Sequence, residues 1–120
     1  MLAAHAWSEV SHVPWSKGEQ YMYFVVFATH KQEMGSERLR LSDAFTDYVH
    51  DPTHHPDVTL HHGGPTLGES DDTVTGLLLV LEAPSLEAAR AFVADSPYAG
   101  ADIFAHSHIR AWKWLTGRPG

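Results

Sequence analysis

The sequence predicts an α+β domain in which a four-stranded antiparallel sheet carries two helices on one face. Two segments, 21–29 and 73–83, are almost continuously apolar and rich in aromatic or branched residues, as central strands are. Two others, 36–50 and 85–96, repeat apolar residues at helical spacing and stop at or just before a proline. Two further strands complete the order, and right-handed crossovers then place both helices on the same side of the sheet.

The first strand is predicted over Tyr21–Thr29, and its continuous apolarity indicates a central strand covered on both faces. Ser36 is expected to cap the helix that follows, because its hydroxyl can accept a backbone N–H of the first turn. Asp51 ends this helix, since a residue before proline is displaced from the helical region. Four residues form its apolar face: Leu41, Phe45, Tyr48 and Val49.

The second half of the chain repeats this pattern. A short strand is predicted over Val58–His62, and Gly63-Gly64-Pro65 is expected to stop it. The third strand spans Thr73–Ala83, after which Ser85 is a suitable cap for the second helix. That helix closes at Ser96-Pro97. Its apolar stripe consists of Leu86, Ala89, Phe92 and Val93.

The last strand is predicted over Ile103–Leu115. From His106 onward its side chains alternate, which places five of them on one side: His106, His108, Arg110, Trp112 and Trp114. The complete order, βαββαβ, is that of a ferredoxin-like fold with both helices on one face of the sheet.

No predicted element covers the second face of this sheet, although its strands supply apolar residues in both directions. A bare apolar face favours a partner, and a closed two-fold dimer is the commonest arrangement. We therefore expect a homodimer with its sheets packed face to face, with Trp112 and Trp114 in the dimer core. The domain is predicted over residues 21–116, after an N-terminal arm, 1–20, and before a C-terminal tail, 117–120.

The composition limits the classes of partner. The formal net charge is −7, which disfavours nucleic acid as a partner. The sequence has neither a basic amphipathic segment nor a long apolar one, so membrane contact is not predicted. The chain has no cysteine, which excludes disulfides and thiolate chemistry and makes a cytoplasmic location the default expectation. Its ten histidines are unusual and make the net charge sensitive to pH near their ordinary pKa.

Four segments together resemble one known family: YFVVFATHK, GGP, SLEAARAFVADSPYAGADIF and HIRAWKW. They resemble the YciI-like proteins, small members of the dimeric α/β-barrel superfamily that are related to the muconolactone isomerase-like and Dabb proteins. The resemblance extends from about Tyr21 to Trp114. It implies a ferredoxin-like fold, a homodimer with the sheets face to face, and a small-molecule pocket.

Members of this family typically carry a histidine on the first helix and an aspartate before the proline that follows the second helix. The resemblance implies that the two act as an acid–base pair and that relatives act on chlorinated aromatic substrates. At these positions the present chain has Phe45 and Ser96, and Asp95 is one residue from the expected aspartate. Phenylalanine cannot transfer a proton and serine needs a neighbouring base, so the family chemistry does not carry over directly.

The predicted topology gathers polar residues at one edge of the sheet, where strands one and two end, strand four starts and the second helix ends. These residues are His30, His62, His106, Asp95, Ser96 and Tyr98. His30 and Asp95 are the leading candidate catalytic pair, since a carboxylate can orient a histidine that acts as acid or base. The other four, with Phe45, are candidate ligand-binding residues. In the structural alternative, His30 caps the strand end and Asp95 accepts backbone N–H groups of the turn.

Further histidines lie in the loop after the first helix and in the second strand: His50, His54, His55, His61 and His62. Imidazole suits several metals, but the chain has no HExxH or comparable motif. His61 and His62 are expected on opposite faces of their strand, which would prevent them from sharing a site. His106 and His108 are two residues apart on a predicted strand, so they share a face and could form half of a metal site. A solvated loop is the simpler interpretation, and no metal ligand or cofactor is assigned.

Three functions stay open at this point. The first is a lyase- or isomerase-type enzyme that uses histidine acid–base chemistry on a small molecule. The second is a small-ligand-binding protein without catalysis, in which Phe45 and Ser96 have replaced the acid–base pair. The third is a protein whose histidines hold a metal.

Overall fold

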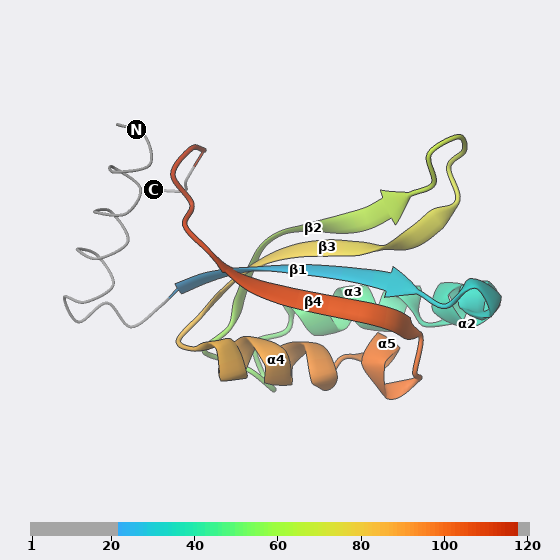
Figure 1. Cartoon of the computed structure of the whole chain (residues 1–120). Coiled ribbons are helices and arrows are strands. Elements are labelled where there is room, and N and C mark those ends of the chain that lie inside the picture. Colours follow the sequence, from blue (N-terminus) through green and yellow to red (C-terminus); the bar gives the residue numbers. More distant parts are fainter. Residues whose placement is uncertain (1–21, 118–120) are drawn as a thin grey trace.

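The computed structural model of the chain describes residues 22–117 (Figure 1). Its strands are β1 (Met22–His30), β2 (Thr59–Leu67), β3 (Val74–Ala83) and β4 (Phe104–Trp112). Its helical elements are a 3-10 turn, η1 (Gln32–Met34), and the helices α2 (Gly35–Arg40), α3 (Ser42–His50), α4 (Leu86–Ala94) and α5 (Pro97–Gly100). The predicted arm, 1–20, and all of the predicted tail except Gly117 lie outside the described residues.

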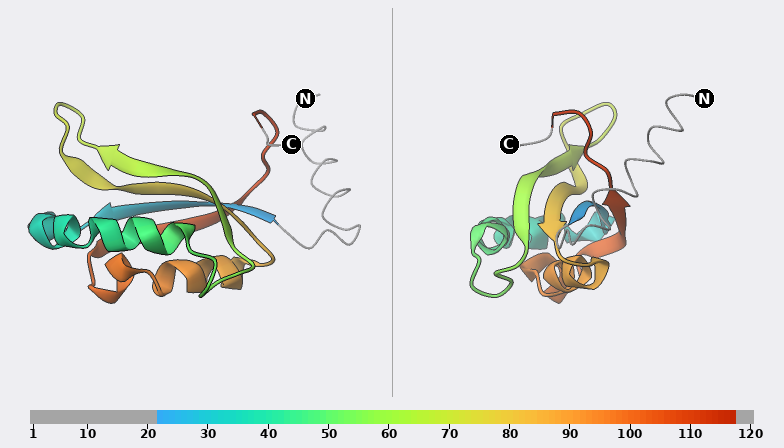
Figure 2. Two further views of the ribbon diagram at one scale, coloured as in Figure 1. Left: turned by 180° about the vertical axis from the view of Figure 1, so that it is seen from behind. Right: turned by 90° about the vertical axis from the view of Figure 1, so that its left-hand side faces the viewer.

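The four strands form one antiparallel sheet in the order β2-β3-β1-β4. The helices α3, α4 and α5 lie on one face of it, as the views from opposite sides show (Figure 1, Figure 2). The predicted ferredoxin-like α+β fold is therefore confirmed. None of the helices within residues 22–117 has the length and apolar content needed to span a bilayer.

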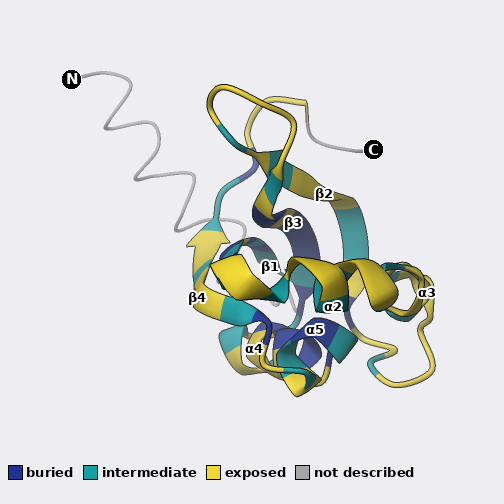
Figure 3. Ribbon diagram, turned by 90° about the vertical axis from the view of Figure 1, so that its right-hand side faces the viewer, coloured by how far each residue is buried: buried dark blue, intermediate teal, exposed yellow. Residues whose placement is uncertain are grey.

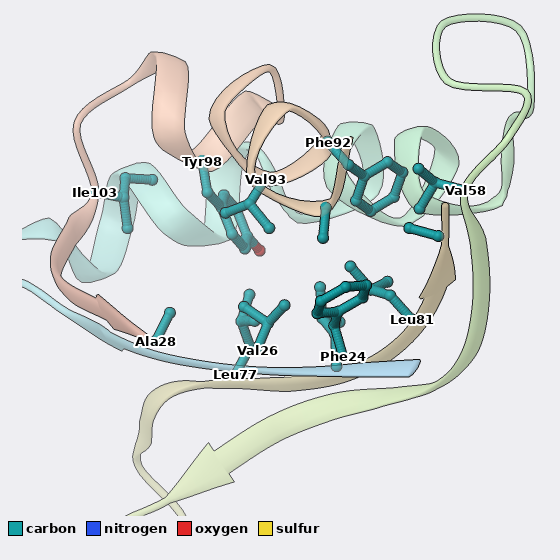
Figure 4. Packing of buried hydrophobic residues seen from close by; sticks show 13 residues of the cluster. Phe24, Val26, Ala28, Val58, Leu77, Leu81, Phe92, Val93, Tyr98 and Ile103 are labelled. Carbon is teal, nitrogen blue, oxygen red and sulfur yellow. The ribbon is translucent and has the colours of Figure 1, made fainter. Parts of the chain in front are cut away.

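The core lies between the sheet and these helices (Figure 4). Alternate residues of β1 point into it, and Phe24, Val26 and Ala28 are all fully buried. Phe92 of α4 and Tyr98 of α5 face them from the helical layer. The two-residue period of a strand thus continues toward the end of β1, where the next inward-facing position is occupied by a histidine.

The predicted cap of the second helix is confirmed. The hydroxyl of Ser85 accepts the backbone N–H of Ala88 at 3.0 Å, so α4 begins as the sequence predicts. After α4 ends, Ser96 caps the short helix α5 by accepting the N–H of Ala99 at 3.3 Å. The Ser96-Pro97 step therefore closes one helix and opens another.

The first predicted helix differs from expectation. Helical backbone begins before Ser36, and the N-cap residue of α2 is Met34, which makes no side-chain cap. Because η1 already supplies a helical turn ahead of α2, Ser36 lies inside the helix rather than at its cap. The helix is also interrupted at Leu41, and next to this break the hydroxyl of Ser42 donates to the carbonyl of Leu39.

The second strand is longer than predicted, because Gly63-Gly64-Pro65 continues β2 instead of stopping it. Among the described strands this one is at an edge of the sheet and pairs with β3 alone. A proline lacks the backbone N–H of a ladder, but an edge strand tolerates it. The strand therefore ends at Leu67, and His62 lies within it rather than at its end.

The other face of the sheet carries no helix among the described elements (Figure 1, Figure 2). Phe27 of β1 and Leu78 of β3 are cross-strand neighbours on this outer face and are 47% and 39% exposed. Figure 3 shows the same contrast, with buried residues between the layers and exposed ones along much of β4. The outer face is thus the side of the sheet opposite α3, α4 and α5.

Candidate functional site

The histidine at the end of β1 is buried against aromatic rings. His30 points toward the helices and is 9% exposed. Its ring stacks on Phe104, with centroids 5.7 Å apart, and meets the edge of the Tyr98 ring at 5.4 Å. Neither Nδ1 nor Nε2 has a hydrogen-bond partner among residues 22–117. Buried polar atoms are nearly always paired, so this side chain is suited to a partner that comes from outside the chain.

A cleft of about 310 Å³ lies beside His30, between the end of β1, the segment η1–α2 and the start of β3. Its polar lining consists mainly of His30, Lys31, Arg38, Thr29, Thr73 and Thr75. Met34 and Val74 add apolar surface. Within residues 22–117 no carboxylate lines the cleft, although acidic residues outnumber Lys and Arg by 15 to 8 in the sequence.

The surroundings of His30 favour the neutral imidazole. Burial lowers the pKa of His30 below its usual value of 6.5, and the positive charge of Arg38 lowers the pKa further. A neutral ring has one N–H donor and one nitrogen that accepts a proton or a hydrogen bond. His30 can therefore either take up a proton or donate a hydrogen bond near neutral pH.

Asp95 does not reach His30. It follows α4, its side chain is 64% exposed, and its Oδ2 lies 2.9 Å from Nε2 of His55. The loop that carries His55 packs on α4, where the His55 ring meets the edge of the Phe92 ring at 5.7 Å. His30 and Asp95 are therefore not hydrogen-bonded to each other in the structure. The Asp95 carboxylate pairs instead with His55, a partner that the sequence spacing did not indicate.

The other residues from the predicted site at this end of the fold have packing roles. Phe45 stacks on Tyr98 with a centroid distance of 4.2 Å, and Tyr98 in turn contacts His30. The Ser96 hydroxyl donates to the carbonyl of Val93 at 2.7 Å while it caps α5. The two positions at which the resemblance implied an acid–base pair are therefore engaged in the fold, and only Tyr98 borders His30 directly.

His106 and His62 are not among the residues that line the cleft. His106 is opposite Thr29 in the β1–β4 ladder and is exposed on the outer face. A β-bulge between Leu60 and His62 inserts His61 into β2. Both rings then contact Trp114, at centroid distances of 5.5 and 5.6 Å, so the expectation that these two histidines point to opposite faces is wrong.

A second cavity, of about 500 Å³, lies between α3 and β2. Phe45, Val49 and Leu79 are among its apolar lining, and His50, His61 and His62 are at its polar part. Two of these histidines already have partners: His50 Nδ1 lies 2.8 Å from the carbonyl oxygen of Thr46, and His61 Nε2 lies 2.8 Å from a Glu82 carboxylate oxygen. The smaller cleft is the better candidate site, because its buried histidine lacks any such partner.

The metal hypothesis gains no support from these positions. Within the part of the chain that the structure describes, no three His, Cys, Asp or Glu side chains come together as a possible metal site. His55 pairs with the carboxylate of Asp95, and His61 pairs with the carboxylate of Glu82. Each is an ion pair when the imidazole ring is protonated.

The chain matches a known domain family over most of its length. The YCII-related domain family matches residues 22–113, which is most of the sequence. The chain belongs to this family. The resemblance of its strands and second helix to YciI-like proteins is therefore confirmed. No curated protein sequence gives a significant match.

Solved structures similar to this YCII-related protein include an enzyme. A 5-chloro-2-hydroxyhydroquinone dehydrochlorinase from Burkholderia phenoliruptrix, in complex with 2,5-dihydroxybenzoquinone, is 27% identical, with a TM-score of 0.67 over 77% of this chain and 94% of that one. A dimeric ferredoxin-like protein of unknown function from Bacteroides fragilis is 12% identical, with a TM-score of 0.54 over 80% and 98%. A dimeric ferredoxin-like protein from Thermobifida fusca is also 12% identical, with a TM-score of 0.50 over 81% and 93%.

Proposed function

We propose that this YCII-related protein binds a small molecule in the cleft beside His30 and exchanges a proton with it, as a lyase- or isomerase-type enzyme does. The observation that supports the proposal most is the buried His30 ring, whose two nitrogens have no partner within residues 22–117. Burial keeps the pKa of His30 low, so the ring is a proton acceptor near neutral pH. Asp95 is not part of this proposal, because its carboxylate is paired with His55.

The dehydrochlorinase from Burkholderia phenoliruptrix makes a ring-hydroxylated aromatic substrate the first class to test. Loss of hydrogen chloride from such a ring is redox-neutral: the ring first shifts to its keto tautomer, in which the carbon that bears chlorine also bears hydrogen. A base then takes the proton of a second ring hydroxyl, its O–H electron pair forms the second quinone carbonyl, and chloride leaves with the electron pair of its bond to carbon. His30 can supply the base, and the threonines beside it, Thr29 and Thr75, can orient hydroxyl groups. The reaction requires no cofactor for its electron balance.

We further propose that a second copy of the chain covers the outer face. Phe27 and Leu78 are exposed there on neighbouring strands, and an apolar sheet face in water is unfavourable. Two similar structures are described as dimeric. In such a homodimer the helices α3, α4 and α5 lie on the sides of the sheets away from the interface.

One observation favours ligand binding without catalysis. Phe45 and Ser96 stand where the resemblance implied an acid–base pair, and both are used in packing or capping. A single histidine without an orienting carboxylate is a weaker acid–base catalyst than a paired one. The non-catalytic function therefore stays as the second candidate, and the same experiment separates the two.

The test compares the wild type with His30→Gln and with His54→Gln, whose histidine is exposed in the loop between α3 and β2. Binding of 2,5-dihydroxybenzoquinone is measured by calorimetry, and chloride release from 5-chloro-2-hydroxyhydroquinone is measured in the same samples. We expect His30→Gln to weaken binding about tenfold and to slow chloride release a hundredfold or more, the usual range for loss of an acid–base group. His54→Gln is expected to change neither.

Wild-type binding without chloride release, with binding still lost in His30→Gln, would support the non-catalytic function. Equal binding by the wild type and His30→Gln would remove the cleft from consideration. Thermal unfolding of each variant shows whether it is folded.

A further inference from the structure

The cations beside the His30 cleft differ in whether their charge is compensated. Nζ of Lys31 lies 2.7 Å from a carboxylate oxygen of Asp102, so its charge is paired. On α2, the guanidinium of Arg40 is held by both carboxylate oxygens of Glu37. Arg38 lies on the same helix and lines the cleft, yet it has no ion-pair or side-chain hydrogen-bond partner within 22–117.

The charge of Arg38 is not offset by an acidic side chain among the described residues that line the cleft. The net charge of the chain is −7, so acidic side chains are available in excess to pair with arginine. Among the described residues that line the cleft none is acidic, and Arg38, unlike Lys31, has no carboxylate partner. The partly apolar wall that Met34 and Val74 provide reduces solvent screening of a charge bound there. The cleft is therefore a local positive region in an acidic protein.

His30 adds a directional group to this region. Its ring is nine-tenths buried and lines the same cleft as Arg38. With both nitrogens unpartnered, one N–H is available to donate to an oxygen of a bound molecule. An arginine fork and a neighbouring N–H donor are suited to a planar group with two negatively charged oxygens.

We propose that the His30 cleft selects anionic ligands: small, flat molecules that carry a carboxylate or an ionised ring hydroxyl, with Arg38 as the residue that binds the negative charge. This inference rests on the proposed function, because it names the class of molecule that the same cleft takes. The charged group contacts Arg38 and His30, and the apolar body of the molecule lies against Met34 and Val74.

The experiment uses two probes of nearly equal shape, benzoate and the neutral benzamide. Binding to the full chain is measured by NMR titration for the wild type, Arg38→Gln and Arg40→Gln. Arg40 is the matched control, because it lies on the same helix but pairs with Glu37 and does not line the cleft. We expect benzoate to bind the wild type at least about tenfold more tightly than benzamide, the size of one charge-assisted hydrogen bond.

Arg38→Gln is expected to remove this preference, and Arg40→Gln is expected to keep it. Equal binding of both probes by the wild type, no benzoate binding at all, or an unchanged preference in Arg38→Gln would each overturn the selection of anions. The proposed function is judged separately with His30→Gln, which should weaken both probes. If His30→Gln weakens both probes but Arg38→Gln weakens neither, the cleft stands and the anionic class is wrong.

Discussion

Replacing Gly76 by alanine is expected to destabilise the protein by roughly 3 kcal/mol or more, or to prevent folding. Gly76 lies in β3 between Thr29 of β1 and Thr66 of β2. A Cβ atom at this position would overlap the carbonyl oxygen of Ala28 and would lie 2.9 Å from its carbonyl carbon. These are backbone atoms of a central strand, so they cannot move aside as a flexible side chain can.

The matched control is Gly64→Ala in the neighbouring strand β2, where no atom lies within 4 Å of a new Cβ. This variant is expected to change the free energy of unfolding by no more than about 0.5 kcal/mol. Denaturant unfolding followed by tryptophan fluorescence measures both. Gly76 pairs with Thr29, and its chain neighbour Thr75 lines the cleft. Equal unfolding midpoints for the two variants would contradict the close approach of Gly76 to the backbone of Ala28.

Replacing Phe27 by aspartate is expected to convert a dimer into a monomer. Phe27 is exposed beside Leu78 at the middle of the outer face, where the proposed second copy packs. In a two-fold interface each substitution occurs twice, so two unpaired carboxylates would be buried. The dissociation constant of the dimer is expected to rise roughly a hundredfold or more, because burying an unpaired charge costs several kcal/mol.

Sedimentation at micromolar concentration measures the mass directly, with a 13.3 kDa chain as the monomer. The control is Leu39→Asp, which changes an exposed leucine on α2 instead of one on the outer face. The wild type and Leu39→Asp are expected to sediment as dimers, and Phe27→Asp as a monomer. A wild type that sediments as a single chain would contradict the proposed homodimer.

The order of elements could be predicted because each one has a local signal. The apolar strands β1 and β3 and the Ser85 cap of α4 appear in the structure where the sequence predicts them. The errors arise where tertiary position overrides a local signal. Gly63-Gly64-Pro65 reads as a strand exit, but at a sheet edge the proline needs no ladder partner and the strand continues. The bulge at His61 likewise has no local signal.

The candidate site could be predicted only in part. His30 ends a strand whose inward positions alternate, so its place beside the helices follows from the pattern. Its lack of a partner does not, because the position of the Asp95 carboxylate depends on how the loop with His55 crosses to α4. The i,i+3 spacing of Glu37 and Arg40 is consistent with their ion pair, but only the structure shows that Arg38 lines the cleft beside His30.

The proton state of His30 tests the proposed site most directly. Long-range ¹H–¹⁵N NMR reports the protonation of each imidazole, and the spectrum of His30→Gln identifies the His30 signals. Since burial and Arg38 lower the pKa of His30, its ring should stay mostly neutral at about pH 6.5, where solvated histidines are half protonated. Its nitrogen signals should also move when benzoate is added. A His30 ring that protonates at or above the ordinary pKa, with signals unchanged by the ligand, would contradict the proposed role.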